Sequence, residues 1–170
     1  MKIFSTIILS FWMFLFPIDF NTDLSKNTIK KINKALERVW PGKTILQEPV
    51  DGFESVEYLS HLFSLKFDGM EKGYMAIASA PSRFDRFDYL LIVNNEFEIV
   101  AAEILAYRED YGGEIASPRW LKQFVGKKVT DPFKLNEDVV GISGATVSCR
   151  SASIHFKKTL GLLTGLNKNG

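Results

Sequence analysis

The feature that most constrains the fold of this chain is an apolar stripe near its C-terminal end. Its members recur at i, i+3, i+7, i+11 and i+14, and they are Cys149, Ala152, Phe156, Leu160 and Leu163. Residues at this spacing lie on one face of an α-helix, so the stripe predicts a helix that packs against a sheet. It places Cys149 inward, as a small apolar residue rather than a reactive thiol. Gly165 is expected to end the helix.

Upstream of this helix, apolar runs separated by polar connections predict strands. Residues 74–79 (YMAIAS) and 89–93 (YLLIV) are two such runs, and a polar connection at 81–86 joins them. Residues 94–95 make a plausible tight turn, after which residues 97–104 continue as a third apolar strand. These runs predict a β-meander, and helix packing is expected to cover one face of it.

A second amphipathic helix is predicted before the strands. Its apolar residues fall at helical spacing, and they are Ile29, Ile32, Leu36, Val39 and Trp40. We expect Asn27 to cap this helix and Pro41 to stop it. With 46% apolar residues the chain can build one core. We therefore predict a single α+β domain over residues 21–170, an antiparallel β-meander packed against an N-terminal and a C-terminal helix.

Residues 1–20 differ in character from the rest. Lys2 precedes an apolar run whose first charge is Asp19, a pattern typical of an export signal or membrane anchor. No small-x-small cleavage site stands out, and residues 3–18 are slightly fewer than the about 20 that a helix needs to cross a bilayer. Signal and anchor both remain open. Either one predicts an exported protein, periplasmic or at the cell surface, with possible membrane anchorage through its N-terminus.

Charge and composition argue against several classes of partner. The chain has 21 basic and 20 acidic residues, and they are interleaved, so no basic patch for nucleic acid is predicted. One cysteine allows no internal disulfide. The two histidines are too few and too far apart in sequence to suggest a metal site.

The segment just before the C-terminal helix carries the clearest sign of chemistry. In residues 141–148 (GISGATVS), small and hydroxyl-bearing side chains surround the expected helix start. The first N–H groups of a helix lack internal partners, so a phosphate there gains donors and about 0.3 to 1 kcal/mol from the helix dipole. Gly144 and Ala145 allow close approach, and Thr146 is expected at the N-cap or first helical position. An ordinary helix cap has the same composition, so these residues alone leave the function open.

Residues 140–148 (VGISGATVS) resemble the flavinylation motif of the FMN-binding domain family. That family includes the C subunit of sodium-pumping NADH:quinone oxidoreductase and the G subunit of Rnf complexes. The resemblance implies FMN joined to Thr146 by a phosphoester bond, installed outside the cytoplasm by a magnesium-dependent flavin transferase that uses FAD. It also implies that the flavin contacts the neighbouring residues Ser143, Gly144, Ala145 and Ser148.

The resemblance extends upstream to residues 107–115 (YREDYGGEI) and 120–127 (WLKQFVGK). It implies that the first of these segments forms one wall of the pocket for the isoalloxazine ring. The residues expected there are Glu109, Gly112, Gly113 and Ile115. The alternative is a surface loop that closes a strand. Trp120 and Phe124 could likewise flank the ring or seal the core.

One position departs from the family pattern. The family usually has an aspartate six residues before the acceptor threonine, and this chain has Val140 there. The nearest acidic residues are Glu137 and Asp138. If the aspartate helps the transferase or its metal to engage the acceptor, the change predicts slow or absent modification, unless Asp138 reaches the same region.

The resemblance implies an exported flavoprotein electron carrier with covalent FMN and no catalytic acid or base of its own. Its expected partners are the flavin transferase and either redox proteins or a quinone-linked membrane complex. The alternatives are a flavin-dependent reductase of the same fold and an exported adaptor domain that has lost its flavin.

Overall fold

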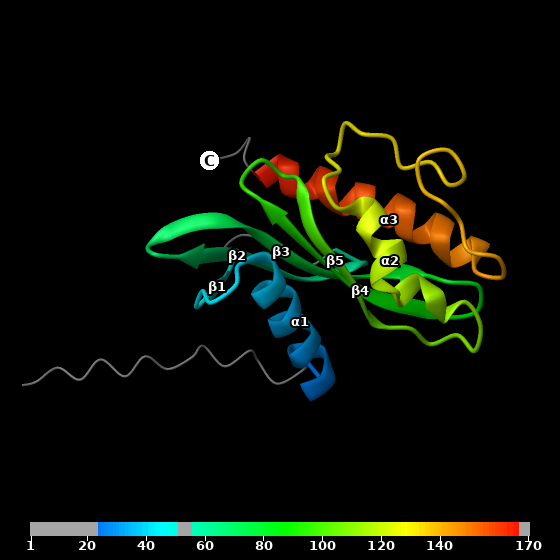
Figure 1. Cartoon of the computed structure of the whole chain (residues 1–170), viewed down its shortest axis with the longest axis horizontal. Helices are drawn as coiled ribbons and strands as arrows, with labels where there is room; N and C mark the ends of the chain where they lie inside the picture. Colours follow the sequence, from blue (N-terminus) through cyan, green and yellow to red (C-terminus); the bar gives the residue numbers. More distant parts are fainter. Residues whose placement is uncertain (1–23, 51–55, 167–170) are drawn as a thin grey trace, which may run out of the picture.

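The computed structural model describes residues 24–50 and 56–166, so the segment predicted to direct export lies outside the described residues (Figure 1). Within these described ranges, five strands form one antiparallel sheet in the order β1-β2-β3-β4-β5. Their bounds are β1 (Leu46–Pro49), β2 (Leu59–Phe67), β3 (Met70–Pro81), β4 (Arg86–Asn94) and β5 (Ile99–Ala106). The predicted α+β fold with an antiparallel β-meander is confirmed.

Helices cover both faces of the sheet, which is more than the one face that the sequence pattern led us to expect. The C-terminal helix α3 (Thr146–Leu166) lies on one face and the N-terminal helix α1 (Lys26–Val39) on the other (Figure 1). β4 shows the reason, because consecutive residues are apolar and point alternately to the two sides. Tyr89 and Leu91 pack on the α3 side, whereas Leu90 and Ile92 pack on the α1 side.

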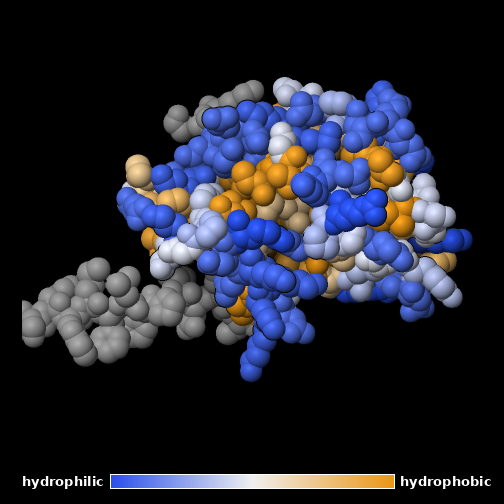
Figure 2. Space-filling view, viewed as in Figure 1, coloured by the Kyte–Doolittle hydropathy of each residue, from blue (hydrophilic) through white to orange (hydrophobic). Residues whose placement is uncertain are grey.

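The N-terminal helix begins two residues earlier than the sequence pattern predicts. Ser25, not Asn27, is its N-cap, and the Ser25 hydroxyl accepts a hydrogen bond from the Thr28 N–H at 3.2 Å. Both residues are good caps, but Ile29 donates its N–H to the Ser25 carbonyl at 3.0 Å, which places Asn27 inside the first turn. The helix buries Ile32, Ala35 and Leu36, and its outer side is hydrophilic (Figure 2).

The C-terminal helix confirms the predicted stripe, since all five of its members are fully buried. Gly165 was expected to end the helix, but it lies in the last turn, and the helix ends one residue later, at Leu166. A hydrogen bond of 2.8 Å between the Tyr89 and Thr159 hydroxyls also joins the helix to β4. None of the helices in the described ranges is long and apolar enough to span a membrane.

Within the described residues, three short helical segments follow the sheet. A 3-10 turn, η1 (Gly113–Ala116), is followed by α2 (Pro118–Leu121) and a second 3-10 turn, η2 (Lys122–Phe124). Ser117 caps α2 through a hydrogen bond from the Trp120 N–H to its hydroxyl, and Pro118 occupies the first helical turn. Trp120, Leu121 and Phe124 are buried in the same core as α3, and the ring centre of Phe124 lies 4.8 Å from that of Phe156 on that helix.

Candidate functional site

Thr146 is the first residue of α3, as the sequence predicts. The first N–H of the helix to reach an internal carbonyl is that of Cys149, which donates to Ala145 at 2.9 Å. Ala145 precedes the helix and has no side-chain acceptor, so it cannot cap the N–H groups of residues 146–148 as a serine would. Gly144, with a φ of 80°, makes the preceding turn. The helix start therefore offers N–H donors next to an exposed threonine hydroxyl.

A cleft of about 250 Å³ opens at this helix start. Its lining comes from three segments far apart in the chain: the β3–β4 connection, the loop after β5 and the first turn of α3. The lining residues are Arg83, Phe84, Tyr107, Glu109, Tyr111, Gly144, Ala145, Thr146, Val147 and Ser148. Within the described part of the chain, the Thr146 hydroxyl makes no hydrogen bond, so it is available to a ligand or a modifying enzyme.

Tyr107 joins the loop after β5 to the first turn of α3. Its hydroxyl donates to the Tyr111 carbonyl at 3.0 Å, and the Ser148 hydroxyl lies 3.0 Å from the same oxygen. Because the tyrosine has one proton to donate, Ser148 is the donor in the second bond. Burial raises the pKa of Tyr107, so it remains a neutral hydroxyl. Ser148 is itself buried and is already used in this contact.

Glu109 lines the cleft, but its carboxylate binds the β3–β4 connection. One oxygen, Oε1, accepts from the Ser82 hydroxyl, from the Phe84 N–H at 2.7 Å and from the Asp85 N–H at 3.1 Å. These donors, that of Phe84 first, lower the pKa of Glu109 and keep it ionised. Glu109 therefore fixes the shape of this connection at the mouth of the cleft.

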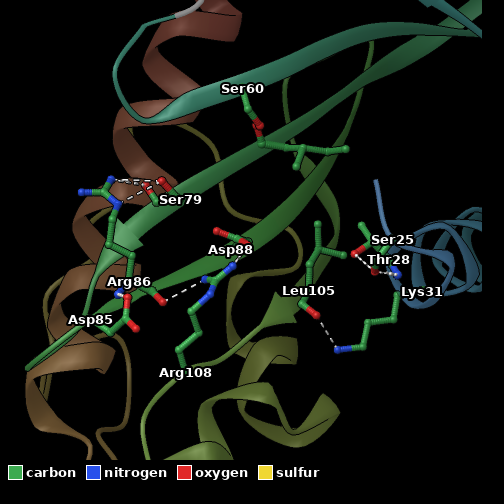
Figure 3. Close-up of polar contacts among 11 residues, drawn as sticks. Ser25, Thr28, Lys31, Ser60, Ser79, Asp85, Arg86, Asp88, Leu105 and Arg108 are labelled. Carbon is green, nitrogen blue, oxygen red and sulfur yellow. Dashed lines mark hydrogen bonds and ion pairs between the residues drawn. The ribbon is translucent and has the colours of Figure 1, made fainter. Parts of the chain in front are cut away.

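The residue before it, Arg108, lines a different hollow, together with Asp88 and with Ser25 and Thr28 at the start of α1 (Figure 3). Its guanidinium pairs with the Asp88 carboxylate and donates to the Arg86 carbonyl at 3.0 Å. Arg86 in turn donates to the Ser79 hydroxyl at 3.0 Å. Two consecutive residues after β5 thus bind neighbouring parts of the chain: Arg108 binds β4, and Glu109 binds the β3–β4 connection.

The segment leading to the helix is held at Val140. The Trp120 indole N–H donates to the Val140 carbonyl at 2.8 Å, and the Val140 N–H donates to Gln123 Oε1 at 2.7 Å. The Val140 side chain itself is 70% exposed. Asp138 does not replace the missing acid in this structure, because its carboxylate accepts the Lys134 N–H at 2.9 Å within its own loop.

The other site residues expected from the sequence fall in different places. Gly113 and Ser143 are exposed and do not line the cleft. Ile115 is fully buried in the core, as is Phe124, and Trp120 is nearly so. Their side chains pack in the core beneath the loop that follows β5. Gly112 of this loop lies against Ala145, just before α3.

Five lining residues were not among the site residues expected from the sequence: Arg83, Phe84, Tyr107, Tyr111 and Val147. Arg83 and Phe84 lie in a stretch that composition marks only as a polar connection, so no local pattern points to them. Tyr107 and Tyr111 each lie two residues from Glu109, which the motif resemblance does identify. Their closeness to Glu109 in sequence was the one signal that could have pointed to them. Cys149 is buried and burial raises its pKa, in agreement with a core role.

The donor set fits a phosphate ester. The helix start supplies N–H groups and the positive end of the dipole, Arg83 adds a cation at the rim, and the Thr146 hydroxyl is exposed among them. Residues 85–160 match the model of the FMN-binding domain family. A search of curated proteins finds no match. The match extends from the residue before β4 into α3, and it contains residues 140–148 and the loop after β5.

Proposed function

We propose that this protein is an exported electron carrier whose FMN is esterified to Thr146, and the match of residues 85–160 to the FMN-binding domain family supports the proposal. The observation that carries the proposal is the position of Thr146. It is the only hydroxyl-bearing residue of the SGAT motif that both lines the cleft and begins α3, within the described residues.

The attachment reaction is a transfer of FMN from FAD. A bond forms between the Thr146 hydroxyl oxygen and the phosphorus of the FMN half, and the pyrophosphate bond of FAD breaks. AMP leaves, and the threonine hydroxyl loses its proton. The flavin transferase would need access to the hydroxyl, and Thr146 is exposed on the first turn of the helix. The N–H groups of residues 146–148 would then hold the ester phosphate.

The chain itself supplies retention and position. The bound flavin contributes one- and two-electron chemistry, and a phosphoester keeps it on a protein that works outside the cytoplasm. The cleft is smaller than the about 300 to 1,000 Å³ of sites that enclose a drug-sized ligand. A flavin there would stay partly exposed, as exchange of electrons with redox proteins or a quinone-linked membrane complex requires.

Intact mass tests the proposal. The full chain is produced with an active flavin transferase in cells that export it, and Thr146→Ala is produced in parallel. We expect an added mass of one FMN less water on the wild type, a yellow protein, and no added mass on the variant. Thr130→Ala, which removes an exposed threonine outside the cleft, should carry the group like the wild type. An unmodified wild type would reject covalent attachment.

A further inference from the structure

Two aromatic rings stand unusually exposed at the mouth of the cleft. Phe84 is 81% exposed and Tyr111 is 83% exposed, the highest values among large hydrophobic side chains in the described ranges. Both line the same cleft as Thr146, although they come from different segments. Single exposed apolar side chains are common on protein surfaces, but two rings beside one hydroxyl acceptor form a localised apolar surface.

The backbone under each ring is held in place. Phe84 donates its N–H to the Glu109 carboxylate at 2.7 Å, and the Arg83 guanidinium lies 5.0 Å from the centre of the phenyl ring. On the other side, the Tyr111 carbonyl accepts the Tyr107 hydroxyl, and Gly112 follows with a φ of 82°. Hydrogen bonds thus hold the backbone under rings that are mostly exposed, which lowers the entropic cost of binding a flat ligand.

We propose that Phe84 and Tyr111 contact the isoalloxazine ring, and that Glu109 is a positioning residue that keeps Phe84 at the cleft. The identity of the ligand rests on the proposed function. A flat heteroaromatic ring with a phosphate at the end of a short chain matches a site with donors at its base and aromatic side chains at its rim. This assigns ring contact to Phe84 and Tyr111 rather than to the buried Ile115 or to the Glu109 carboxylate.

A titration with free FMN tests ring contact without requiring the ester. The full chain, made without the transferase, is titrated with FMN and followed by flavin fluorescence. We expect Phe84→Ala and Tyr111→Ala each to weaken binding about twofold to tenfold, since aromatic pairs contribute about 0.5 to 1.5 kcal/mol. Ile154→Ala, which removes an exposed side chain elsewhere on α3, should bind like the wild type. Equal affinity in all four proteins, or no binding by the wild type, would overturn the assignment.

Glu109 is tested by comparing two substitutions in the same titration. Glu109→Gln keeps an oxygen that can accept from the β3–β4 connection and should retain most of the affinity. Glu109→Ala should weaken FMN binding as much as Phe84→Ala, and combining it with Phe84→Ala should add little. Full additivity of these two changes would show that Glu109 does not act through Phe84.

The flavinylated proteins supply a second readout. Iodide should quench the flavin fluorescence more strongly when Phe84 or Tyr111 is alanine, while intact mass still shows one FMN. That pattern supports ring contact. If the rings instead dock a redox partner, quenching stays at the wild-type value and the assignment fails, although the added mass is present. If the wild type lacks the added mass, covalent attachment to Thr146 is rejected. The contact of Phe84 and Tyr111 with the isoalloxazine ring is still tested, because the titration with free FMN does not depend on the ester.

Discussion

Gly112 lies directly against Ala145, the residue before Thr146. A Cβ built on Gly112 would be 2.7 Å from the Ala145 Cβ and 3.1 Å from the Tyr107 hydroxyl. The contact brings the loop after β5 and the start of α3 together at the cleft, although 33 positions separate the two residues in sequence. Glycine is required there both by space and by its φ of 82°.

Gly112→Ala should destabilise the domain by about 1 to 3 kcal/mol, because a left-handed conformation and a close contact both oppose the new methyl group. Urea unfolding measures the change. Gly113→Ala is the matched control: its φ is not positive and nothing lies within 4 Å of the added carbon. We expect its effect to stay within about 0.5 kcal/mol. Similar stabilities for the two variants would show that the loop does not pack on the helix start.

Val140→Asp should restore the acid that the family usually has without harming the fold. The Val140 side chain is exposed, and only its backbone N–H and carbonyl are used, by Gln123 and Trp120. We therefore expect unfolding free energy to change by less than about 0.5 kcal/mol. Flavinylation, followed by intact mass against time, should become faster than in the wild type and in Val140→Asn. Equal rates for Asp and Asn would show that a carboxylate at this position does not aid the transfer.

The ionised form of Glu109 should stabilise the β3–β4 connection. Its folded pKa is lowered, chiefly by the Phe84 N–H, so this stability is present above the unfolded value of about 4.3 and is lost as pH falls through the folded pKa. Carboxyl NMR shifts should show Glu109 titrating below other glutamates, and the Phe84 amide should move in the same pH range. In Glu109→Gln the Phe84 amide should lose that transition. Titration of Glu109 at an ordinary value would contradict the assigned hydrogen bonds.

Both terminal helices and the meander were predictable because their apolar spacing is regular. The stripe from Cys149 to Leu163 is buried throughout, and the runs at 74–79 and 89–93 lie within β3 and β4. Coverage of both faces was also implicit in the unbroken apolar run of β4, which a strand exposed on one side would not need. The helix caps were less certain because several residues near Asn27 can serve as caps.

The site was predictable only where the chemistry is local. Thr146, the proposed acceptor, is adjacent in sequence to the other residues of the helix start, so residues 143–148 could be recognised together. The β3–β4 connection also lines the cleft. The hydrogen bonds of Glu109 set the position of this connection relative to the loop after β5. No spacing rule links Phe84 to Thr146. The same loop shows why Ile115 was expected at the site: the motif gives its neighbourhood but not the direction of its side chain.

The attachment site itself is tested most directly on one tryptic peptide. Cleavage after Lys134 and Arg150 releases residues 135–150, which contain Ser143, Thr146 and Ser148. Fragmentation of this peptide from flavinylated protein should place one FMN less water on Thr146. The same mass on either serine, or an unmodified peptide from cells with an active transferase, would contradict the account.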